Sequence, residues 1–338
     1  MSNSLLLHVG APKTATTLVQ WKFSGSDVLA ANGVHYPEAG RDPDRIAHHA
    51  LGRMLMDCRA AEAAALLQEE IAPSGLTLVS SESMTNCIAD PRRLPSFQAF
   101  LGATATSVES LRLLMFLREA SDFFESMYLH AIKATGLKAS FDDYLLEREG
   151  WYGRLFANLA TLASDCPRMA PDIRAFVPHA YAADWSDVLG FDPQLDDSQR
   201  VNPRLSLKAQ SLLKEYDAFC ADTGLQMDRL DAIDAFSAAD SPFEDDLHDF
   251  SPYRPGAAEH IRQRVLDDAR RYDRAEYVAA FGDTPARSAP VYAQIDYARL
   301  DQRDLDAAEA FLRAAQQGPD RPGTTHGRER ARAAAFQR

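Results

Sequence analysis

Short apolar runs that stop at glycine or at polar residues constrain the fold of this chain most. The runs at residues 5–9, 76–80 and 111–117 each have the length of a strand that is buried on both faces. Helical patterns separate one run from the next. This alternation predicts an α/β protein with a parallel sheet that is flanked by helices on both faces.

Polar residues follow each run. Lys13 lies in the loop after the first run, and Ser81 and Glu82 follow the second. Arg118 follows the third. Because ligands of open parallel sheets bind beyond the carboxyl ends of the strands, we expect these polar residues to converge on one edge of the sheet.

The rest of the chain is predicted to be largely helical. An amphipathic helix spans 121–135, and further helices span 206–220 and 259–272, with one more strand at 173–177. The final part holds an alanine-rich helix at 301–317 and then 321–338, which carries five arginines and one glutamate. We therefore predict an α/β domain over 1–280 and a helical C-terminal extension with a basic tail over 281–338.

Composition excludes several classes of protein. The 338 residues include 36 Lys and Arg against 49 Asp and Glu, a net charge of -13, which disfavours broad binding to nucleic acid or to anionic membranes. The four cysteines lie far apart, which argues against a zinc module or a disulfide scaffold. The N-terminus lacks the pattern of a signal peptide, and no run of roughly 18 apolar residues predicts a membrane span. These features predict a cytoplasmic protein.

The loop after the first run has the setting of a phosphate site. A helix that begins at Thr16 would present backbone N–H groups and the positive end of its dipole, and Lys13 adds a full charge. A Walker A loop aligned on Gly10 would need glycine at 15 and lysine at 16, where this chain has Ala15 and Thr16. No later run ends in the aspartate of a magnesium-holding element, so a kinase or NTPase is the less favoured alternative.

Residues 8–17, His-Val-Gly-Ala-Pro-Lys-Thr-Ala-Thr-Thr, resemble the 5′-phosphosulfate-binding loop of sulfotransferases, whose usual form is Pro-Lys-Ser/Thr-Gly-Thr-Thr. Ala15 stands where the usual form has glycine. The resemblance implies that this loop binds the 5′-phosphate of 3′-phosphoadenosine 5′-phosphosulfate (PAPS), the sulfuryl donor. The residues implied in that binding are Ala11, Pro12, Lys13, Thr14, Ala15, Thr16 and Thr17.

A second segment resembles the 3′-phosphate-binding element of the same family. There an arginine ends a strand and a serine follows eight positions later, as Arg118 and Ser126 do here. A guanidinium forks onto a phosphate, and a serine hydroxyl donates to it from a helix. Residues 80–82 and 200–203 also look like fragments of bacterial members. The resemblance covers about residues 4–280 and implies a P-loop NTPase-like fold, PAPS as donor and no metal.

Sulfuryl transfer also needs a base for the acceptor, a role that the family fills with histidine or glutamate. Glu82 is the favoured candidate, since it follows a strand end beside the implied donor site. His48, His49 and Glu38 are the other candidates. Lys13 is expected to stabilise the departing oxygen.

The acceptor stays open at this point. A hydroxyl or amine of a small molecule or a glycan fits the implied chemistry, and nothing in the sequence indicates the oligomeric state. The second alternative is a non-catalytic module that binds nucleotide without transfer, which Ala15 and the basic tail suggest.

Overall fold

The computed structural model describes residues 3–42, 46–148, 150–195, 205–238, 240–244, 246–283 and 292–317. The chain divides into two compact units, which are described separately below. The first unit comprises Met1–Phe123, Arg148–Val201 and Ala258–Arg287, and the second comprises Phe124–Glu147, Asn202–Ala257 and Ser288–Arg338. This spatial division does not test the predicted domain boundary at residue 280, which stays a prediction.

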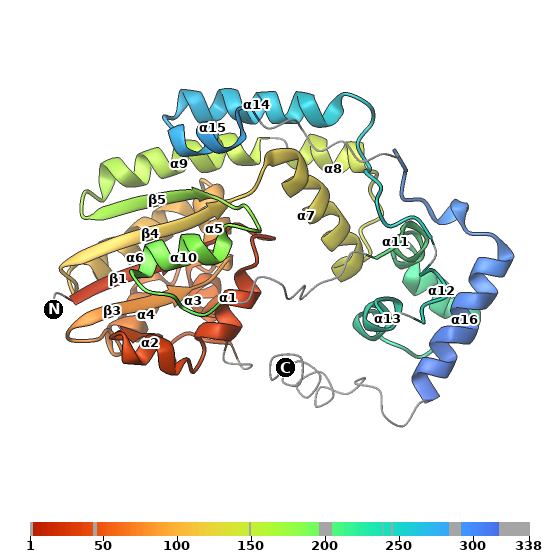
Figure 1. Cartoon of the computed structure of the whole chain (residues 1–338), viewed down its shortest axis with the longest axis horizontal. Coiled ribbons are helices and arrows are strands. Elements are labelled where there is room, and N and C mark those ends of the chain that lie inside the picture. The colour runs from red at the N-terminus through yellow and green to blue at the C-terminus, as the bar shows by residue number, and fades with distance from the viewer. Residues whose placement is uncertain are drawn as a thin grey trace. The chain divides into compact units, whose positions relative to one another are not determined.

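The first unit is built on a five-stranded sheet in which all neighbouring strands run parallel (Figure 1). The order of the strands across the sheet is β2-β3-β1-β4-β5. Their bounds are β1 (Asn3–His8), β2 (Val34–His35), β3 (Gly75–Ser80), β4 (Ser110–Leu117) and β5 (Met169–Ala175). The predicted α/β class with a parallel sheet is therefore confirmed.

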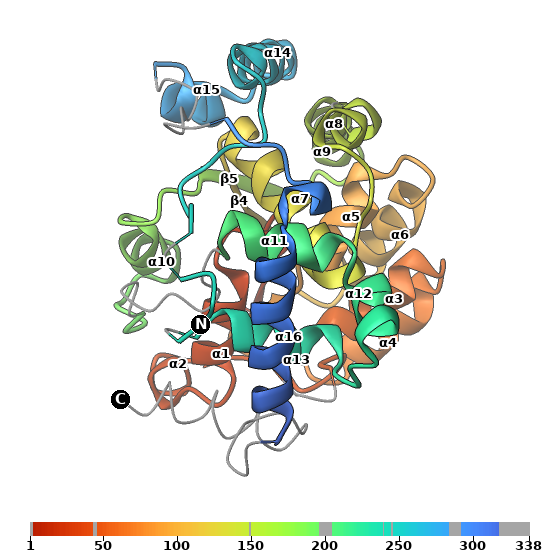
Figure 2. The ribbon, with the colours of Figure 1, turned by 90° about the vertical axis from the view of Figure 1, so that its right-hand side faces the viewer.

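Both faces of this sheet are buried. Leu6, Leu78 and Leu114 belong to the core on one face, whereas the alternate residues Leu7 and Val79 are fully buried on the other. Figure 2 shows α10 and α2 on one side of the sheet and α5 and α6 on the other. This double burial explains why the central strands are continuous apolar runs.

The helices of the first unit follow the strands or connect them. Their bounds are α1 (Thr16–Phe23), α2 (Asp27–Ala31), α3 (His49–Met56), α4 (Ala60–Gln68), α5 (Ser83–Ala89), α6 (Leu94–Ala105), α9 (Trp151–Asp165), α10 (Tyr181–Leu189), α14 (Ala257–Arg271) and α15 (Ala275–Phe281). Helix α7 (Ala120–Thr135) begins in this unit and continues into the second. It matches the predicted helix at 121–135, and the carboxylate of Glu119 accepts a hydrogen bond from the N–H of Asp122 in its first turn.

The second unit is helical apart from one isolated parallel bridge between Ser251 and Tyr292, as far as its residues are described. Its elements are α8 (Phe141–Arg148), α11 (Leu207–Lys214), α12 (Tyr216–Thr223), α13 (Arg229–Phe236), η1 (Tyr297–Arg299) and α16 (Gln302–Gln317). The single helix predicted over 206–220 is two helices that meet at Glu215. The tail at 321–338 lies outside the described residues. None of the described helices is long and apolar enough to cross a bilayer.

Candidate active site

The loop after β1 lies between the ends of β3 and β4. The N–H of Ala11 donates to the carbonyl oxygen of Phe116 on β4 at 3.3 Å, and the N–H of Ser81 donates to the carbonyl of His8 at 2.9 Å. These bonds continue the parallel pairing beyond the strands themselves. The loop, Glu82 and Arg118 therefore emerge at one edge of the sheet, where the sequence predicts them.

Two non-glycine residues of the loop adopt left-handed backbone conformations. Lys13 has φ 71° and Ala15 has φ 55°. The hydroxyl of Thr14 donates to the carbonyl of Ala11 at 2.7 Å, which closes the turn that contains Lys13. Ala15 is the N-cap of α1, and it lies in a backbone region that disfavours a β-carbon. Glycine, which is usual at the matching position of the sulfotransferase loops that this segment resembles, would avoid that strain.

The first residues of α1 meet the carboxylate of Glu82. The hydroxyl of Thr16 donates to Oε2 of Glu82 at 2.7 Å, and Pro12 and Thr17 are half-buried. The pKa of Lys13 lies below its ordinary value because burial disfavours the charged form, while Glu82 counteracts this shift. A lysine, a threonine and a carboxylate thus share one small space.

Arg118 reaches from the end of β4 to the same loop. Its Nη1 donates to the carbonyl oxygen of Lys13 at 3.0 Å, and its Nε donates to a carboxylate oxygen of Asp122 at 2.5 Å. The guanidinium carbon lies 5.9 Å from the centroid of the Phe176 ring. Nη2 makes no hydrogen bond to a described residue, and 23% of the side chain is exposed.

Two buried tyrosines fix the backbone of Arg118. Tyr152 donates to its carbonyl oxygen at 2.7 Å, and Tyr277 donates to the same oxygen at 3.2 Å. Burial raises the pKa of both phenols well above its usual value, so both keep their protons. Ser126 lies further along α7, in the second unit, and its predicted part in phosphate binding stays a prediction.

His48 is held by the backbone through both ring nitrogens. Its Nδ1 accepts from the N–H of Ser80 at 3.1 Å, and its Nε2 lies 2.9 Å from the carbonyl oxygen of Pro37, to which it donates in that tautomer. Burial lowers the pKa of His48 to about 4. The ring links three segments of the first unit. Both ring nitrogens are engaged by the backbone, so neither is available to take a proton from a substrate.

His49 differs from His48. It is half-buried, and its Nδ1 lies 3.1 Å from the hydroxyl oxygens of Ser81 and Ser83. These two serines flank Glu82, so His49 stands beside the favoured candidate base. Glu38, the remaining candidate, is exposed.

Sequence reasoning missed His8, which lies directly beneath the loop. It is fully buried, its Nδ1 is 2.9 Å from the hydroxyl of Ser80, and its Nε2 has no hydrogen-bond partner among the described residues. Burial lowers its pKa to about 3. A β-carbon at Gly10 would lie 2.8 Å from Nε2 and 2.6 Å from Cγ2 of Thr16. The signal that could have found this contact is a histidine that ends an apolar strand two residues before a glycine.

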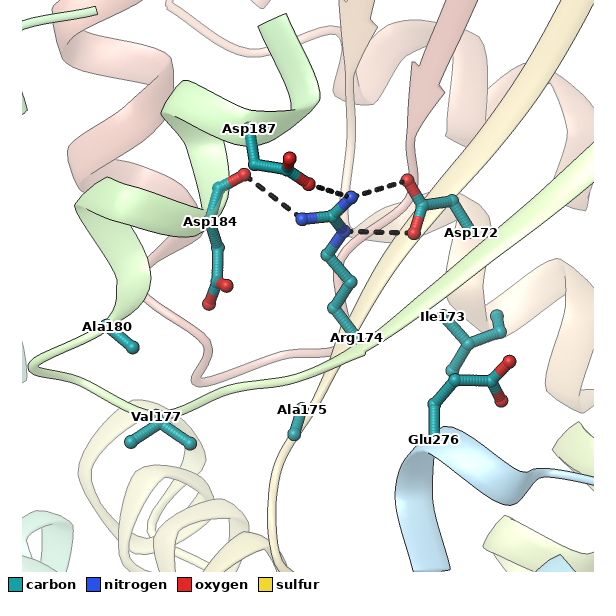
Figure 3. A pocket seen from close by; sticks show the side chains of 9 residues that line it. All are labelled: Asp172, Ile173, Arg174, Ala175, Val177, Ala180, Asp184, Asp187 and Glu276. Atoms are coloured by element: carbon teal, nitrogen blue, oxygen red, sulfur yellow. Dashed lines mark hydrogen bonds and ion pairs between the residues drawn. The ribbon is translucent and has the colours of Figure 1, made fainter. Parts of the chain in front are cut away.

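A separate cavity of about 480 Å³ opens beside β5 and α10 and shares no lining residue with the loop (Figure 3). Among the described residues that line it, Arg174 is the one cation; it pairs with Asp172 at 2.9 Å and with Asp187 at 2.8 Å. Asp184 and Glu276 complete the acidic lining. Within the described ranges, no three histidine, cysteine or acidic side chains gather so as to hold a metal ion.

Comparison of the chain with families of known proteins, with curated proteins and with solved structures gives no match. The geometry of the loop, Glu82 and Arg118 is therefore the basis for any functional assignment.

Proposed function

We propose that this protein is a sulfotransferase that moves a sulfuryl group from PAPS to a hydroxyl or amine. The observation that carries the proposal is the meeting of Lys13, Glu82 and Arg118 at the carboxyl edge of one parallel sheet. Lys13 and Arg118 are linked by one hydrogen bond from the guanidinium to the backbone of Lys13, so the two cations could each bind one phosphate of a bisphosphate nucleotide. The carboxylate of Glu82 could serve as the base.

The 5′-phosphate is assigned to the loop after β1. Lys13 supplies the charge, Thr16 and Thr17 supply hydroxyl donors, and the first N–H groups of α1 have no helical partner. Ala11, Pro12, Thr14 and Ala15 shape the turn that holds these donors.

The 3′-phosphate is assigned to Arg118. Its guanidinium is half-buried, and its backbone is fixed by Tyr152 and Tyr277, so its position costs little entropy on binding. The sequence adds Ser126 to this phosphate on the strength of the family resemblance alone.

The transfer itself is an in-line displacement. The acceptor atom bonds to sulfur while the bond from sulfur to the 5′-phosphate oxygen breaks, and the acceptor proton passes to Glu82. Lys13 stabilises the charge that develops on the departing oxygen. This chemistry calls for no resident metal.

A small molecule or a glycan remains the acceptor class that we propose. We place the reaction in the cytoplasm, which is supported by four cysteines that are all free thiols.

Transfer is tested by incubating the protein with PAPS and a panel of phenols, amines and saccharides and measuring the release of the desulfated nucleotide. We expect Lys13→Ala to lower turnover by about 100-fold or more, the usual effect of removing a group that stabilises developing charge. Lys22→Ala is the control, because Lys22 lies in the last turn of the same helix. Wild-type turnover in Lys13→Ala would refute the assignment.

A further inference from the structure

At each of the two assigned phosphate sites, one hydrogen-bonding group already has a carboxylate partner, namely Thr16 at the loop and Nε of Arg118. At the loop, the hydroxyl of Thr16 donates to Glu82 at 2.7 Å, and the same carboxylate raises the pKa of Lys13 against the effect of burial. A phosphate that binds there has to replace Glu82 as the acceptor of the Thr16 hydroxyl.

The same arrangement recurs at Arg118. Asp122, one helical turn further on, accepts from Nε at 2.5 Å, and both side chains are about a quarter exposed. A phosphate that forks onto the guanidinium through Nε has to displace Asp122. Glu82 and Asp122 come from different elements, yet each stands where one phosphate is assigned.

Charge makes both replacements selective. A carboxylate and a phosphate that compete for one hydrogen-bond donor also repel each other. A ligand therefore binds only if its phosphate interacts with that group more favourably than the carboxylate that it displaces. A nucleotide with both phosphates gains at both places, whereas one with a single phosphate leaves one pair intact.

We infer that Glu82 and Asp122 are specificity-determining residues of the PAPS site. Glu82 competes with the 5′-phosphate for the hydroxyl of Thr16, and Asp122 competes with the 3′-phosphate for the guanidinium of Arg118. The inference rests on the proposed function. The inference also implies an order of binding. The carboxylate of Glu82 loses its hydrogen bond from Thr16 only when a 5′-phosphate accepts that hydrogen bond instead. The base then becomes available to the acceptor only while donor is bound.

Calorimetric titration with 3′-phosphoadenosine 5′-phosphate (PAP) and with AMP tests the inference. Glu82→Gln should raise the affinity for both ligands equally, by about five- to thirtyfold, because a neutral amide binds the Thr16 hydroxyl less strongly than a carboxylate does. Asp122→Asn should tighten PAP by about two- to fivefold and leave AMP unchanged, as suits a partly exposed pair. Glu62→Gln is the control: it makes the same change of charge on α4, where Glu62 pairs with Arg59.

Turnover separates competition from a merely structural role. Glu82→Gln should bind donor more tightly and yet transfer at least about 100-fold more slowly if the carboxylate is also the base. Binding by the wild type without tightening in either variant overturns the inference and leaves the proposed function standing. Binding of PAP neither by the wild type nor by Glu82→Gln/Asp122→Asn refutes both, and binding by the double variant alone supports the competition.

Discussion

Arg118 donates a hydrogen bond from Nη1 to the carbonyl oxygen of Lys13 at 3.0 Å. The bond joins the end of β4 to a loop residue whose φ is 71°, so one assigned cation stabilises the strained backbone of the other. The two assigned phosphate sites are therefore coupled through a single backbone atom, and a change at Arg118 is expected to affect both.

Replacement of Arg118 by alanine should lower the affinities for PAP and for AMP by different factors. Loss of the guanidinium removes the proposed 3′-phosphate contact and should lower the affinity for PAP by about ten- to hundredfold. Loss of the bond to Lys13 also loosens the loop and lowers AMP affinity by about two- to fivefold. Calorimetric titration of both nucleotides measures the two effects.

Arg112→Ala is the matched control, because Arg112 lies on the same strand and donates instead to the carbonyl of Val188. Its nucleotide affinities should equal those of the wild type. An Arg118→Ala protein that still preferred PAP to AMP by the wild-type ratio would contradict the 3′-phosphate assignment.

Gly10 should tolerate no side chain. A β-carbon there would lie 2.6 Å from Thr16 and 2.8 Å from His8, so Gly10→Ala should lower the free energy of unfolding by about 1–3 kcal/mol through overpacking. Gly102→Ala is the opposite case, since nothing lies within 4 Å of its β-carbon inside α6, and it should gain up to about 1 kcal/mol. Urea denaturation of the two variants should give changes of opposite sign; equal changes would mean that the close approach at Gly10 is absent.

Ala15→Gly should relieve backbone strain without cost to the loop. The left-handed conformation at φ 55° costs an alanine about 1–2 kcal/mol, and the extra freedom of glycine in the unfolded chain offsets about half of that. We expect a melting temperature at or slightly above that of the wild type, with donor affinity retained. Ala65→Gly, in the exposed middle of α4, should instead lose about 1 kcal/mol. If Ala15→Gly were destabilised as much as Ala65→Gly, the left-handed assignment would be wrong.

The strands that the sequence predicts best are those buried on both faces. β1, β3 and β4 are continuous apolar runs, and their predicted positions agree with the structure to within about a residue or two. The sequence predicts β5 at 173–177, whereas the strand occupies Met169–Ala175. Pro171 and Asp172 interrupt the apolar pattern at its start, and an edge strand tolerates both residues. β2 has two residues, too few to show a period.

The candidate site likewise has a part that the sequence predicts and a part that it does not. Lys13, Glu82 and Arg118 each follow an apolar run, so their convergence follows from the parallel sheet alone. The carbonyl of Arg118 is held by Tyr152 and Tyr277, which lie far along the chain on helices that only tertiary packing brings to β4. No local pattern encodes such a contact.

His8 should make the protein sensitive to mild acid. Burial lowers its pKa from 6.5 in the unfolded chain to about 3 in the folded protein. Below pH 6.5 the unfolded chain therefore binds a proton that the folded protein does not, and the free energy of unfolding falls as the pH falls. Its share amounts to roughly 2 kcal/mol between pH 6.5 and pH 5. His48, with a pKa of about 4, adds a loss of the same sign.

His8→Asn isolates this contribution, because an asparagine amide can still bond the hydroxyl of Ser80. The variant should be less stable than the wild type at pH 7.5, yet its denaturation midpoint should fall less steeply between pH 7 and pH 5. His179→Gln, which removes an exposed histidine, is the control and should follow the wild-type slope. Parallel slopes for His8→Asn and the wild type would show that His8 takes up its proton in the folded state, and would place solvent beneath the loop.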